Sequence, residues 1–212
     1  MNAIVESLAR YRLVPVIEID QAKQAEPLAR LLVECGLPVA EVTLRSAEAL
    51  DALDRMKRSQ PELLIGAGTV LTADQAVQAK EAGADFLVSP GLNPIVVHKA
   101  MDLNLPMIPG VNNPSHIEQA MSLGLSAIKF FPAEASGGVA FLKAILAPYK
   151  GLSVMPTGGI NADNLKDYLS IPQVFACGGS WFVKKELIQQ GDFEQIKHLL
   201  QHTLQGVNQI KG

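Results

Sequence analysis

The chain has 212 residues, of which 48% are hydrophobic and 18% are charged, with a formal net charge of −3. This length suits one domain with a large core, and we predict a single domain over residues 1–212. No stripe of lysine and arginine suggests binding to a nucleic-acid backbone, and no run of 18 apolar residues is present to span a membrane.

The first segment, MNAIVESLARYRL, is predicted to form a helix ahead of the first strand. It carries Glu6 and two arginines, and it lacks the long apolar core of a signal peptide. The two cysteines, Cys35 and Cys177, lie far apart and form neither a metal-binding nor a disulfide pattern. We therefore expect a cytoplasmic protein.

Short apolar runs then recur about every 20 to 25 residues, as expected of strands that alternate with helices. The predicted strands are Leu13–Ile19, Val39–Leu44, Leu63–Thr69, Phe86–Pro90, Pro106–Val111, Ala127–Pro132, Ser153–Gly158 and Val174–Gly179. The glycines at expected helix C-termini are Gly36, Gly83 and Gly124. The side chains expected to cap helix starts are Asp20, Thr72, Ser115 and Asn161.

Eight strand–helix units in a chain of this length predict an α/β fold, a small (β/α)8 TIM barrel. A doubly wound open sheet is the alternative, because periodicity alone does not show that the sheet closes. A last helix, at about residues 192–209, is expected to cover the barrel. Active sites of such barrels lie at the C-terminal ends of the strands, so polar residues there are candidates for chemistry.

The second predicted strand, VAEVTLR, carries Glu41, Thr43 and Arg45 on one face, because side chains alternate along a strand. If the apolar residues between them face the helices, the polar side chains point into the barrel and can bracket a small ligand. An internal ion pair is the structural alternative, but ionised pairs in a low-dielectric interior add little stability. A functional role is therefore favoured.

The third predicted strand, LLIGAGTV, ends in small residues and Thr69. Its glycines are explained if they relieve crowding inside the barrel. Thr69 would then offer a hydroxyl group at the barrel mouth, where it can bind a substrate carboxylate beside Arg45.

The sixth predicted strand, AIKFF, contains Lys129 in its middle, although lysine is almost never buried without a partner or a function. The side chain could simply reach solvent. The buried-looking Glu41 and two nearby glycine pairs favour instead an amine desolvated among Phe130 and Phe131. Burial favours the neutral form of an amine, which can add to a carbonyl group to form a Schiff base.

The seventh and eighth predicted strands end in MPTGGI and ACGGSW. Glycine lets a ligand approach the backbone closely, and barrel phosphate sites often lie after strands seven and eight. A single glycine pair would more simply be a tight turn, but two pairs at these ends predict a phosphate site. The residues of this site are Gly158, Gly159, Gly179 and Ser180.

These segments resemble the 2-keto-3-deoxy-6-phosphogluconate (KDPG) and 2-keto-4-hydroxyglutarate (KHG) aldolase family. The resemblance rests on EVTLR, KFFPAE and PTGGI in combination, and it extends from about residue 13 to residue 183. It implies a class I aldolase on a (β/α)8 barrel, without metal or other cofactor, that assembles as a homotrimer.

The resemblance also implies a role for each candidate residue. Lys129 would be the Schiff-base lysine and Glu41 the general acid and base. Arg45 and Thr69 would bind the pyruvyl carboxylate. The distal phosphate would be bound by Gly158, Gly159, Gly179 and Ser180.

The expected reaction is cleavage of KDPG to pyruvate and glyceraldehyde 3-phosphate, with KHG as a second substrate. The galactonate epimer of KDPG is the alternative, since the segments GLNPIVVHKAMDLNLP and GVNNPSHIE are less typical of the family. A metal-dependent aldolase, a phosphosugar isomerase or epimerase, and a non-catalytic sensor are less favoured. His198 and His202 have metal-ligand spacing, but they follow the last strand and are expected on an exposed helix.

Overall fold

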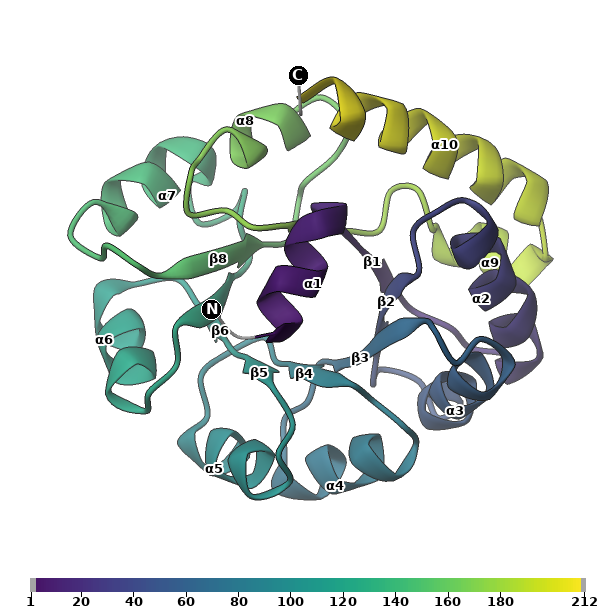
Figure 1. The fold of residues 1–212 in the computed structure, drawn as a ribbon, viewed down its shortest axis with the longest axis horizontal. Helices are drawn as coiled ribbons and strands as arrows, with labels where there is room; N and C mark the ends of the chain where they lie inside the picture. Colours follow the sequence, from purple (N-terminus) through teal and green to yellow (C-terminus); the bar gives the residue numbers. More distant parts are fainter. Residues whose placement is uncertain (1–2, 211–212) are drawn as a thin grey trace.

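A curled parallel β-sheet with helices around it forms the fold (Figure 1). The computed structural model describes residues 3–210. Its strands are β1 (Leu13–Ile17), β2 (Val39–Thr43), β3 (Leu64–Gly68), β4 (Phe86–Val88), β5 (Met107–Ile108), β6 (Gly110–Val111), β7 (Ala127–Phe130), β8 (Ser153–Pro156) and β9 (Cys177–Gly179).

The helices alternate with the strands along the chain, and all but the first lie around the outside of the sheet (Figure 1). They are α1 (Ala3–Tyr11), η1 (Ala22–Gln24), α2 (Ala25–Glu34), α3 (Ala49–Ser59), α4 (Ala73–Glu81), α5 (Pro94–Asp102), α6 (Pro114–Ser122), α7 (Gly138–Leu146), α8 (Leu165–Leu169), α9 (Lys185–Gln190) and α10 (Phe193–Ile210). In the described part of the chain, no helix combines the length and apolar character needed to cross a bilayer.

The strands form a six-stranded sheet, β5-β4-β3-β2-β1-β9, and a three-stranded sheet, β6-β7-β8. The predicted α/β class is thus confirmed, with a curled parallel sheet in place of one continuous eight-stranded ladder. The fifth predicted strand is split at Pro109, which has no N–H group to donate. The eighth begins at Cys177, and Val174 forms only an isolated bridge with Val154.

Helix α1 lies across the middle of the ring of strands (Figure 1). Its apolar residues Ile4, Val5 and Leu8 are buried in a cluster with residues from the strand starts, among them Val14 and Val39. A second, larger apolar cluster lies between the strands and the outer helices. Because α1 fills the interior near the strand starts, polar side chains inside the ring are confined to the opposite, carboxyl end.

The predicted helix ends are confirmed at most positions. Gly36, Gly83 and Gly124 have φ values of +76°, +91° and +77°, a conformation that glycine adopts without steric cost. Thr72 caps α4 and forms a capping box with Gln75.

Other predicted caps differ in detail. Asn161 accepts from the backbone N–H groups of residues 163 and 164, ahead of α8. Helix α6 is capped by Asn113 and not by Ser115. The prediction for Asp20 is wrong, because its carboxylate binds Lys185 and Gln189 instead of a helix start. The predicted last helix is confirmed as α10, which packs against α2, α8 and α9.

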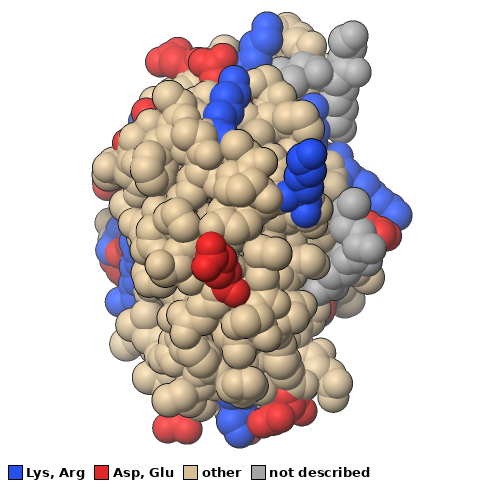
Figure 2. Space-filling model, turned by 90° about the vertical axis from the view of Figure 1, so that its left-hand side faces the viewer, with Lys and Arg blue, Asp and Glu red and all other residues tan. Residues whose placement is uncertain are grey.

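The side of the molecule that carries α6 and α7 has few charged side chains (Figure 2). Met121 of α6 and Phe141 of α7 are 45% and 40% exposed. Single exposed apolar residues of this kind are ordinary on a protein surface.

Candidate active site

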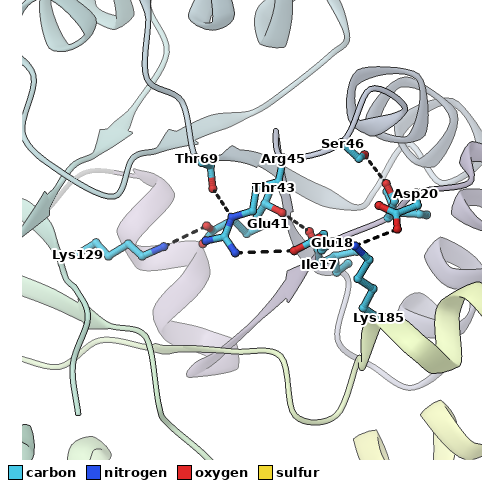
Figure 3. Close-up of polar contacts among 11 residues, drawn as sticks. Ile17, Glu18, Asp20, Glu41, Thr43, Arg45, Ser46, Thr69, Lys129 and Lys185 are labelled. Atoms are coloured by element: carbon cyan, nitrogen blue, oxygen red, sulfur yellow. Dashed lines mark hydrogen bonds and ion pairs between the residues drawn. The ribbon is translucent and has the colours of Figure 1, made fainter. Parts of the chain in front are cut away.

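A lysine and a glutamate face each other inside the ring of strands (Figure 3). Nζ of Lys129, on β7, lies 3.2 Å from Oε1 of Glu41, on β2. The two side chains are 7% and 0% exposed. The prediction that Lys129 is buried within reach of the second-strand carboxylate is confirmed, and the alternative that it reaches bulk solvent is wrong.

Only one of the two predicted phenylalanines lies near the amine. The centre of the Phe131 ring is 5.2 Å from Lys129 Nζ, whereas Phe130 is buried on the helix side, where it stacks on Phe141 at 6.1 Å. Successive residues of a strand point to opposite faces, so Lys129 and Phe130 cannot share an environment. The prediction that both rings desolvate the lysine is wrong for Phe130.

The carboxylate of Glu41 has a buried oxygen that is free to bind a ligand. Oε1 accepts from Lys129, but Oε2 has no hydrogen-bond partner within residues 3–210. Such unpaired buried oxygens are rare, because they lose their hydration without compensation. Gly68 makes room for this side chain, since a Cβ atom there would lie 2.4 Å from Glu41 Oε1. This confirms the prediction that the glycines of the third strand relieve crowding.

Arg45 and Thr69 meet at the mouth of the ring (Figure 3). Nε of Arg45 donates to Oγ1 of Thr69 at 3.3 Å, and the arginine side chain is 49% exposed. Thr69 has φ = +58°, which is unusual for a β-branched residue and costs about 1–3 kcal/mol. The strained backbone places this hydroxyl group against the guanidinium, as expected of a site whose geometry matters more than its stability.

The predicted site residues surround one cavity of about 150 Å³. Thr69 is the exception, since it lies outside the lining but binds Arg45. The lining contains the other predicted residues: Glu41, Arg45, Lys129, Gly158, Gly159, Gly179 and Ser180.

The glycine pairs pack so closely that no side chain fits. Gly158 and Gly159 have φ values of +99° and +80°, and a Cβ on Gly159 would lie 2.6 Å from Glu134. A Cβ on Gly179 would overlap the ring of Trp181 at 1.8 Å. Glycine is therefore required at Gly159 and Gly179, both of which line the cavity.

A contact between Tyr168 and Glu134 supports the loop that contains Gly158 and Gly159. The Tyr168 hydroxyl group donates to Glu134 Oε1, and the backbone N–H of Glu134 donates to the Gly158 carbonyl at 3.0 Å. Burial, and then the Glu134 carboxylate, raise the pKa of Tyr168 well above its ordinary value. The phenol therefore remains a donor at neutral pH.

Two polar features of the site were not predicted. Thr157 lines the cavity, is 6% exposed, and has a hydroxyl oxygen without a partner in the described residues. Its position at the end of a predicted strand, next to the glycine pair, is the signal that could have found it. The second feature is a group of ion pairs around Glu18, which the polar end of the first strand, VIEID, could have indicated.

Within residues 3–210, no cluster of three or more His, Cys, Asp or Glu side chains is arranged to hold a metal ion. His198 and His202 both lie on α10, and neither lines the cavity.

The fold and the site define an α/β enzyme with a buried amine and a carboxylate at the carboxyl ends of parallel strands, a pair suited to carbonyl chemistry. A sequence model described as KDPG and KHG aldolase matches residues 4–199. The chain belongs to this family, and the predicted resemblance is confirmed. It is thus an aldolase, a lyase that acts on carbon–carbon bonds.

Similar proteins cover nearly the whole chain. A 2-dehydro-3-deoxy-phosphogluconate aldolase of Haemophilus influenzae is 54% identical over 201 residues, or 95% of each chain. A KHG/KDPG aldolase of Escherichia coli K12 is 42% identical over 91% of each chain. The structure of a KDPG aldolase from Legionella pneumophila has a TM-score of 0.90 and 38% identity, covering 94% of this chain and 97% of that one. It holds pyruvate as a covalent carbinolamine intermediate.

Proposed function

We propose that this chain is a class I aldolase that cleaves KDPG to pyruvate and glyceraldehyde 3-phosphate. The observation that carries the proposal is the buried contact of 3.2 Å between Lys129 Nζ and Glu41 Oε1. The names of the similar proteins support the substrate, and the carbinolamine in the Legionella structure supports covalent chemistry. A phosphosugar isomerase or a binding protein would have no use for this amine.

The first step forms the Schiff base. Glu41 accepts a proton from the Lys129 ammonium, and the neutral amine adds to the C2 ketone of the keto acid. The resulting carbinolamine loses its hydroxyl group as water, using a proton that Glu41 returns. The product is an iminium ion bonded to Nζ of Lys129.

The second step breaks the C3–C4 bond. Glu41, directly or through a water molecule, removes the proton from the C4 hydroxyl group. The electrons of the C3–C4 bond move into the iminium, which becomes an enamine, and glyceraldehyde 3-phosphate leaves. Protonation of the enamine at C3 and hydrolysis of the iminium then release pyruvate and free Lys129.

The remaining predicted residues bind the two ends of the substrate. The planar guanidinium of Arg45 can bind both oxygens of the pyruvyl carboxylate, with Thr69 fixing its orientation. The backbone amides of the loops that contain Gly158, Gly159, Gly179 and the hydroxyl group of Ser180 bind the distal phosphate. This remote binding positions the reacting carbons.

The ring of strands is, in our proposal, a closed (β/α)8 barrel that forms one domain. Two features support closure: β5 and β6 are separated only by Pro109, and bridges join Val154 to Val174 and Thr157 to Gly178.

Assembly as a homotrimer is also part of the proposal. It is supported by the face with few charges at α6 and α7, which exposes Met121 and Phe141 (Figure 2). The cytoplasmic location stays a prediction from the sequence.

A second substrate, KHG, is favoured by the 42% identity with the KHG/KDPG aldolase of Escherichia coli. It would be cleaved to pyruvate and glyoxylate by the same steps. Because KHG lacks the phosphate, its turnover would depend less on the glycine loops than that of KDPG.

Borohydride trapping tests the proposal. Reduction of the protein in the presence of pyruvate should add the mass of a reduced pyruvyl group to the peptide that contains Lys129, and Lys129→Ala should abolish both trapping and pyruvate release. Coupled assays with KDPG, its galactonate epimer and KHG then rank the substrates. Full activity of the Lys129→Ala protein would end this proposal.

A further inference from the structure

Four charged side chains form a group at the mouth of the ring, next to the proposed substrate cavity (Figure 3). They are Glu18 and Asp20, which follow β1, Arg45, which follows β2, and Lys185, the first residue of α9. The group has two carboxylates and two cations, so its charges balance while no ligand is bound.

The carboxylate of Glu18 is shared unequally between the two cations. Its Oε1 accepts from Lys185 Nζ at 2.5 Å, whereas its Oε2 lies 3.8 Å from Arg45 Nη1. Lys185 is itself fixed by Asp20 at 2.9 Å, and Asp20 also accepts from Gln189 Nε2 at 2.6 Å. Glu18 is therefore bound firmly to Lys185 and only loosely to Arg45.

This inequality matters because Glu18 carries the same chemical group that Arg45 is proposed to bind in the substrate. A carboxylate free to form two hydrogen bonds with the guanidinium would compete directly with the incoming keto acid. The hydrogen bonds to Glu18 and Asp20 raise the pKa of Lys185, so its ammonium remains charged at neutral pH. Lys185 is thus a permanent alternative partner for Glu18.

We propose that Lys185 is a positioning residue, which keeps Glu18 away from Arg45 and leaves the guanidinium free for the carboxylate of the keto acid. The inference rests on the role of Arg45 in the proposed function. Lys185 acts on substrate binding through Glu18 and takes no part in the bond-making steps. Its effect should therefore appear in KM and not in kcat.

The test is a double-mutant cycle with K185M, E18Q and the combined variant. K185M keeps the apolar stem and removes the charge, so Glu18 is left with Arg45 alone. We expect KM for the keto acid, and the pyruvate concentration for half-maximal borohydride trapping, to rise about fivefold, the upper range for a partly exposed ion pair. The combined variant should return both values to those of the unaltered enzyme, because glutamine does not compete as an anion.

Arg55 provides a matched control. It lies on α3 with Asp51 at 3.0 Å and Glu26 at 4.0 Å, so it is also a cation between two carboxylates, but outside the lining of the cavity. Replacing it with methionine should leave KM unchanged.

A purely structural role predicts a different pattern. If Lys185 only anchors α9, K185M should lower kcat or stability, and E18Q should not reverse the change. Either that pattern or an unchanged KM in K185M overturns the inference. If K185M does not fold, E18Q alone still tests the inference. A KM of E18Q at or below that of the unaltered enzyme supports the role of Lys185, and a higher KM contradicts it.

One further variant separates this inference from the proposed function. If Arg45→Met leaves KM for the keto acid unchanged, Arg45 does not bind the substrate carboxylate and that part of the proposed function fails. If Arg45→Met raises KM while K185M does not, only the role of Lys185 is refuted.

Discussion

The substitution Gly68→Ala should impair catalysis because the added methyl group displaces the neighbouring carboxylate of Glu41. The new Cβ would lie 2.4 Å from Oε1, 2.8 Å from Cγ and 2.9 Å from Cδ of Glu41. Carbon atoms in ordinary contact stay about 3.5 Å apart, so the side chain must shift by about 1 Å. Glu41 is fully buried, and its shift would disturb the 3.2 Å contact with Lys129 Nζ.

The size of the effect follows from this displacement. A misplacement of about 1 Å can reduce a rate by about 100-fold, which lies within the range for general acid–base catalysis. Overpacking should cost only about 1–3 kcal/mol of folding free energy. Gly68 is not among the residues with positive φ, so alanine can adopt its backbone conformation. We expect a folded protein with kcat about 100-fold lower.

The assay is pyruvate release coupled to a dehydrogenase, with thermal unfolding measured in parallel. Gly206→Ala is the control: it lies on α10, and a Cβ there meets no atom within 4 Å. That variant should keep its kcat and gain up to about 1 kcal/mol from better helix propensity. A folded Gly68→Ala protein with kcat within a factor of two of the unaltered enzyme would refute the argument.

Three further predictions concern strain, pH and thiol reactivity. Thr69→Gly should relieve the strained backbone and raise the free energy of unfolding by about 1 kcal/mol in denaturant titrations, while KM for the keto acid rises; lower stability would contradict this. Tyr168 has a raised pKa in the folded state, so its contribution to stability is present below about pH 10 and lost as the pH rises further. Unfolding free energies should therefore fall more steeply above pH 10 for the unaltered protein than for Tyr168→Phe, and parallel curves would exclude a role for the phenol. Burial raises the pKa of both thiols, but Cys177 is buried whereas Cys35 is partly exposed, so only Cys35 should react with a thiol reagent before unfolding, and two rapid equivalents would contradict this.

The fold was largely predictable because apolar runs and glycine caps are local signals. What the sequence did not reveal was the interruption of the fifth strand at Pro109, since proline is tolerated at the start or edge of a strand as well. The isolated bridges from Val154 to Val174 and from Thr157 to Gly178 join residues far apart in the sequence, which no local pattern specifies.

The buried pair of Lys129 and Glu41 was predictable for a different reason. A charged residue within an apolar strand, as at Lys129 and Glu41, is costly enough to require an explanation. The Glu18–Lys185 contact was missed because its partners are 167 residues apart and each lies where a charged residue is ordinary. The strain at Thr69 was missed because threonine gives no local sign of a left-handed backbone.

Helix α1 closes one end of the ring of strands to ligands. Its side chains Ile4, Val5 and Leu8 seal one end with apolar packing. In the proposed reaction, substrate and both products would then share the opening at the other end, beside Arg45. The aldehyde fragment would have to leave through this opening before water enters by the same route to hydrolyse the lysine-bound pyruvyl group.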